Sequence, residues 1–96
     1  MAIKFSDKNS SFIAPVNTIQ VRVVDYPNGL RVFDNVQMAR ILSDNYNLLI
    51  MADHIPTLGE IHGTLEIVDE DGIKNIENIN AFYMHRKNVL SVLIKD

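Results

Sequence analysis

The sequence predicts an all-β protein, an antiparallel β-sandwich of roughly eight to ten short strands. Clusters of Gly, Pro, Asn and Asp recur about every 8–12 residues, as is typical of such folds. Between these turns apolar and polar residues alternate, and no long window has the helical period. The chain has 96 residues, of which 47% are hydrophobic. This indicates one domain that can bury its own core.

Residues 1–17 are the least patterned part, and we interpret them as an N-terminal arm with room for a short edge strand. Pro15 argues against a central strand there, because proline cannot donate a ladder hydrogen bond. We assign residues 18–96 to the sandwich domain.

The first two strands are predicted around a tight turn. IQVRVV places Ile19, Val21 and Val23 on one face of a strand. DYPNG follows, in which proline presets φ and Asn-Gly accepts positive φ, so the chain turns and resumes as LRVF. VQMARIL then reads as a strand of about seven residues or as a short helix, because Met, Ala, Arg and Leu also favour helices.

The stretch NLLIMADHIPTLGEI contains an apolar run that stops abruptly at Asp53-His54 and is followed by Pro56. Two explanations remain open at this point. His54 can cap a buried strand while Pro56 stiffens a turn, or the chain can hold out a rigid loop for a partner to touch.

The second half continues the β pattern. IHGTLEIV alternates, and its Gly63 suggests a bulge or a close backbone approach. DEDG is a turn, IKNIENINAFYM reads as two short strands with a bulge, HRKN is another turn that contains His85, and VLSVLI is the last strand. The residues expected in the core are Ile19, Val21, Val23, Leu48, Ile50, Leu65, Ile67, Phe82, Val89 and Val92.

Composition excludes several function classes. A net charge of -3 offers nothing to attract nucleic acid or anionic lipid. Apolar runs fall far short of the roughly 20 residues of a membrane span, so we expect no direct membrane insertion. The absence of cysteine excludes disulfides and thiolate chemistry.

We predict no catalytic residues, no metal site and no cofactor. His54, His62 and His85 show no recognised ligand spacing, and DEDG lacks an oxygen ligand at the first position of a calcium loop. The chain contains neither a G-x-S-x-G elbow nor a phosphate-binding loop.

Several segments, taken in order, resemble the epsilon subunit of F-type ATP synthases, which is called delta in mitochondria. VRVVDYPNGLRVFDN is similar to the opening of that family. NLLIMADHIPTL is similar to its Gly-Glu-Leu-Gly-Ile-Leu-Pro-Gly-His-Ala-Pro-Leu motif, and INAFYM with NVLSVLIKD to its final strands. The resemblance covers about residues 18–96. The motif positions that match are Leu48, Ile50, His54 and Pro56, while Leu49 and Ala52-Asp53 depart from it.

The resemblance implies a non-catalytic central-stalk subunit. Such a subunit docks the gamma subunit to the c-ring and couples ion translocation to ATP synthesis, at the cytoplasmic, inner face of the cell membrane. This chain matches only the family's β-sandwich domain, so we expect neither its C-terminal helical hairpin nor ATP binding. The loop with the matching histidine faces the c-ring in that family, beside gamma. The partner-binding residues it implies are Asn45, Asn47, His54, Pro56 and Leu58.

Two other functions stay open on the sequence. An unrelated small β-sandwich adaptor or ligand-binding module fits the same composition. A small hydrolase is the third hypothesis, although no nucleophile stands out.

Overall fold

The computed structural model describes residues 17–95, which contain seven strands and no helix. The all-β class is therefore confirmed. The expected count of eight to ten short strands becomes seven in this part of the chain, because two strands are long, with 13 and 15 residues. The predicted arm lies outside the described residues, except for Asn17. The strands are β2 (Ile19–Asp25), β3 (Gly29–Val36), β4 (Met38–Ser43), β5 (Asn47–Ile50), β6 (Thr57–Asp69), β7 (Gly72–Arg86) and β8 (Val89–Ile94).

All seven strands belong to one sheet with the order β3-β2-β8-β7-β6-β4-β5. The sheet is mixed rather than wholly antiparallel, because β2 and β8 run parallel while the other neighbouring pairs are antiparallel. The alternation of apolar and polar residues along a strand does not show which strands become neighbours. This parallel pair joins the first and last described strands, and alternation could not have predicted it.

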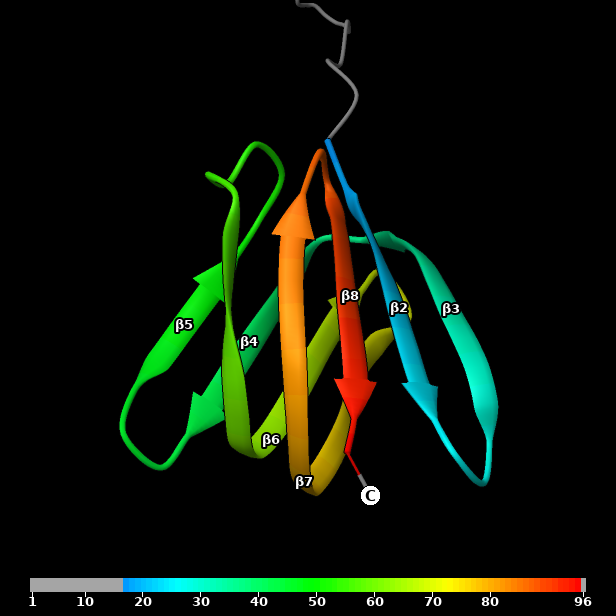
Figure 1. Cartoon of the computed structure of the whole chain (residues 1–96). Coiled ribbons are helices and arrows are strands. Elements are labelled where there is room, and N and C mark those ends of the chain that lie inside the picture. The colour runs from blue at the N-terminus through cyan, green and yellow to red at the C-terminus, as the bar shows by residue number, and fades with distance from the viewer. Residues whose placement is uncertain (1–16, 96) are drawn as a thin grey trace, which may run out of the picture.

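The single sheet folds over on itself across its two long strands (Figure 1). The first part of β6 and the second part of β7 lie in one layer with β8, β2 and β3. Their remaining parts lie in the other layer with β4 and β5. The chain crosses between the layers after β3, where the Gln37 N–H donates to the Val68 carbonyl at 2.8 Å.

A bulge lies where β6 and β7 bend. The pairing shifts between Gly63 and Leu65, and Asn78 on the facing strand has a positive φ of 57°. A Cβ atom at Gly63 would stand 2.1 Å from the Leu42 carbonyl oxygen. Both features predicted for Gly63, a bulge and a close backbone approach, are therefore present. The bulge predicted in IKNIENINAFYM is present too, but within one continuous strand.

The core lies between the layers and draws on every strand. Seven of the ten residues expected there are buried: Ile19, Val21, Val23, Ile50, Leu65, Ile67 and Val92. The buried residues form one contiguous cluster. Such a cluster is the expected way for a single small domain to be stabilised.

Three expected core positions differ. Phe82 is 47% exposed, because Ala81 and Tyr83 are the inward-facing residues of β7 there. Val89 is half-buried, and its neighbour Leu90 takes the core position. Leu48 is partly buried and packs against the cluster from its edge. In each case the strand is apolar on both faces, so the alternation of residues could not show which face points to the core.

Candidate functional site

The five residues expected to bind a partner fall into two groups. Asn45 lies in the loop before β5, and Asn47 is the first residue of that strand. His54 and Pro56 lie in the loop 51–56 at the other end of β5, and Leu58 is the second residue of β6. These two loops lie at opposite ends of β5 (Figure 1). The five residues therefore do not form a single cluster.

His54 packs one edge of its ring against the protein interior and is not fully exposed. Its side chain is half-buried, and its ring meets that of His85 edge-on, with the ring centroids 5.8 Å apart. His54 Nδ1 lies 2.9 Å from the Ile55 carbonyl oxygen. The expectation that His85 lies in a turn is wrong, because it belongs to β7 and is fully buried. The outward positions after His54 belong to Ile55, Pro56 and Leu58.

An apolar face covers the outer side of the layer that contains β2 and β8. Strand pairing sets its side chains in two rows, since residues opposite each other in a sheet point to the same side. One row runs Leu30, Val24, Leu93 and Phe82. The next row runs Val32, Arg22, Ser91, Met84 and Leu58.

This face is hollowed into an open groove of about 550 Å³. We define the apolar face by the six large apolar side chains that line the groove: Val24, Leu30, Leu58, Phe82, Met84 and Leu93. All six are exposed, and Leu58 reaches 76%. Contiguous exposed apolar surface with a polar rim is typical of protein–protein interfaces.

Charged groups lie in and around the groove. Arg22 is one of the residues that line it. Lys95 lies over the Phe82 ring, with its Nζ 4.5 Å from the centroid, and reaches Glu60 at 3.2 Å. The hydrogen bond from Lys95 is the main cause that lowers the pKa of the Glu60 carboxyl. The apolar face therefore ends at Glu60 and Lys95 in a polar border.

Leu58 is the one residue of the apolar face for which the sequence predicts a binding role. The sequence does contain a sign of a second apolar face, because AFYM and VLSVLI have apolar residues at both odd and even positions. A strand that is apolar on both sides needs cover on both sides. In β7 and β8, one side faces the core and the other side forms part of the apolar face. Ile55, 72% exposed in the loop 51–56, was missed as well.

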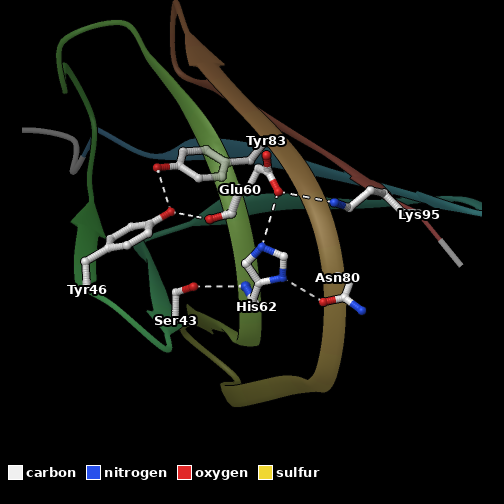
Figure 2. Close-up of polar contacts among 7 residues, drawn as sticks. All are labelled: Ser43, Tyr46, Glu60, His62, Asn80, Tyr83 and Lys95. Atoms are coloured by element: carbon white, nitrogen blue, oxygen red, sulfur yellow. Dashed lines mark hydrogen bonds and ion pairs between the residues drawn. The ribbon is translucent and has the colours of Figure 1, made fainter.

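A polar cluster beside the apolar face has a structural role (Figure 2). The strand β4 stops pairing with β6 at Gly63, which leaves backbone groups of β6 without a strand partner. The Ser43 hydroxyl accepts from the His62 N–H at 2.9 Å, and the Tyr46 hydroxyl donates to the Glu60 carbonyl. These side chains replace ladder hydrogen bonds that a strand would supply.

Two further groups complete this cluster. The Tyr46 hydroxyl also lies 3.2 Å from that of Tyr83, whose pKa burial raises. His62 Nδ1 lies 2.8 Å from Asn80 Oδ1, and its Nε2 lies 3.2 Å from Glu60. The arrangement supplies hydrogen bonds but places no nucleophile next to a base.

Residues 17–95 contain no group of three or more His, Asp or Glu side chains that could hold a metal ion. The same part of the chain has no helix long and apolar enough to cross a membrane.

Comparison with solved structures finds a similar fold. Neither a scan against protein-family models nor a comparison with curated proteins finds a match. Among solved structures, the chain is similar to one in the cryo-EM structure of the Tetrahymena thermophila mitochondrial ATP synthase central stalk and c-ring, with a TM-score of 0.64 and 16% identity. The match covers 86% of this chain and 67% of that chain. The protein thus has a fold that also occurs in the central stalk and c-ring region of an ATP synthase.

Proposed function

We propose that this protein is a non-catalytic, epsilon-like subunit of the central stalk of an F-type ATP synthase. It docks a gamma subunit to the c-ring and so couples ion translocation to ATP synthesis. The observation that carries the proposal is the exposed apolar face, on a fold shared with a central-stalk protein.

The apolar face supports contact with a large subunit. Its six side chains come from five neighbouring strands, so a partner that contacts all six must reach across the width of this layer. Burial of exposed apolar area stabilises such a contact by about 25 cal/mol per Å² before the costs of association. We assign this face to gamma.

The loop 51–56 supports a second contact at the end of the same layer. Ile55 and Pro56 are exposed there, and Leu58 belongs both to this end and to the apolar face. We assign the loop tip to the c-ring, with His54 holding the loop from beneath. Asn45 and Asn47, at the other end of β5, would make a separate contact. One chain could then touch two partners at once, as a coupling subunit must.

Affinity purification of the tagged full chain from its own cells tests the proposal. We expect gamma and c-ring subunits to be recovered with it, as identified by mass spectrometry. Deleting the gene should leave the catalytic part able to hydrolyse ATP while ion pumping is lost. Recovery without any synthase subunit, together with unchanged pumping in the deletion strain, would contradict the proposal. An unrelated adaptor would instead bring down other proteins.

A further inference from the structure

Among the described residues, two backbone N–H groups of the loop 51–56 donate hydrogen bonds, one within the loop and one outside it. Within the loop, the His54 N–H donates to the Met51 carbonyl at 3.1 Å. Across to the turn between β7 and β8, the Asp53 N–H donates to Asn88 Oδ1 at 2.7 Å. Asp53 also adopts a positive φ of 67°, which costs energy for a residue other than glycine. Few bonds therefore hold the loop closed, and packing beneath it matters.

His85 lies beneath this loop and is an unusual core residue. Its side chain is completely buried, and neither ring nitrogen has a hydrogen-bond partner among residues 17–95. A neutral imidazole always carries one N–H, so a buried donor is left unsatisfied at a cost. The cross-strand neighbours of His85 are Thr57 on β6 and Leu90 on β8, neither of which titrates.

Among residues 17–95, no acidic side chain contributes to the pKa of His85 or would stabilise its imidazolium. The titratable group that acts on His85 is His54, whose ring lies edge-on at 5.8 Å. Tyr83 is the inward residue before it on β7, and its hydroxyl lies within hydrogen-bond distance of that of Tyr46. Asp53 of the loop and Arg86 and Lys87 of the β7 end are exposed. Burial, then the charge of His54, lower the pKa of His85.

We propose that His54 and His85 form a proton-sensitive latch that holds the loop 51–56 closed. At neutral pH the buried His85 ring is uncharged and packs against the His54 ring, and the loop covers His85. When His85 binds a proton, a charge without a partner is buried beside a second histidine. Movement of the loop away from β7 relieves this, because it admits water to the imidazolium and separates the rings.

The latch is a property of this chain alone, whereas its consequence rests on the proposed function. The loop carries Ile55 and Pro56, which we assign to the c-ring contact. Acidification would therefore weaken that contact by displacing the surface that makes it. A failure of docking and a failure of the latch are distinguishable, because the latch is measured without any partner.

Amide hydrogen exchange of the full chain, measured by NMR at about pH 7.5 and about pH 5.5, tests the latch across the range in which histidine titrates. After correction for the intrinsic rate, we expect protection of the Asp53 and His54 amides to fall by about tenfold or more at the lower pH. Protection of Ile67, a core residue of the other layer, should change far less. That contrast separates local opening from global unfolding.

His85→Phe removes the titrating group while it retains ring volume, and it should abolish most of the pH effect on the loop. His62→Gln is the matched control, since His62 lies outside this contact and should leave the wild-type response intact. In wild-type protein the histidine NMR signals should show His85 titrating together with the loop amides. The latch is refuted if His85 titrates while Asp53 and His54 stay protected, or if His85→Phe keeps the full pH response.

Discussion

Single residues decide how closely the two long strands and their neighbours can approach. Gly63 is the clearest case, because the Leu42 backbone occupies the space that a side chain would need. Gly29 differs: nothing lies within 4 Å of a Cβ there, and only its φ of 70° restricts substitution. A glycine can thus be required by contact or by backbone conformation, and the sequence alone does not show which.

We predict that Gly63→Ala destabilises the protein by about 2–3 kcal/mol or more, since backbone rather than a flexible side chain must move. Gly29→Asn is the matched control, because asparagine tolerates positive φ, and it should cost less than about 1 kcal/mol. Urea unfolding followed by circular dichroism measures both. Equal stability of the two variants would show that the bulge can open to admit a methyl group.

The lowered pKa of His85 predicts how the free energy of unfolding of the whole domain depends on pH. Its pKa is lowered in the folded protein, so the unfolded chain binds the proton first. The stability that His85 contributes is therefore present above about pH 6.5, the usual histidine value, and is lost as the pH falls through the folded pKa. We expect a lower urea midpoint at about pH 5.5 than at about pH 7.5.

His85→Phe should flatten this dependence. The carboxyls of Asp25, Glu60 and Asp69, whose pKa values are also lowered, titrate below this window and do not obscure it. An unchanged slope in His85→Phe would mean that other groups set the pH response.

At the scale of elements, the alternation of apolar and polar residues predicts the core-facing side of some strands but not of others. In β2 and β6 one face is clearly more apolar, and the predicted core residues Val21, Leu65 and Ile67 are buried. In β7 and β8 both faces are apolar, because one packs on the core and the other forms the apolar face. Which face turned inward was decided by tertiary packing, and here the prediction of Phe82 as a core residue is wrong.

Replacing one residue from each kind of strand face tests this distinction. Ile67→Ala should cost about 2–5 kcal/mol, the usual range for core truncation. Phe82→Ala should cost only about 1 kcal/mol, because Phe82 is half-exposed on the outer side of its layer, where its ring contacts Lys95. Denaturant unfolding of both variants gives the comparison. A loss for Phe82→Ala as large as that for Ile67→Ala would place the phenyl ring in the core.

At the scale of the whole molecule, the sequence supports the all-β class and most of the core, but not the way one sheet folds into two layers. Long-range pairings such as β2 with β8 join segments about 70 residues apart and leave no local pattern. The candidate site was predicted in part, since the resemblance pointed to the loop 51–56 and Leu58. The apolar face was not predicted, because exposure depends on the strand order.

Binding to the gamma subunit encoded in the same genome, measured by calorimetry with purified proteins, tests the central claim most directly. Leu58→Asp places a charge on the apolar face at its most exposed side chain. Ile73→Asp is the matched control, 62% exposed, in the part of β7 that lies in the other layer. We predict that wild-type protein and Ile73→Asp bind alike, and that Leu58→Asp weakens binding by about tenfold or more, or about 1.4 kcal/mol. The absence of binding by wild-type protein, or equal binding by Leu58→Asp, would contradict the account.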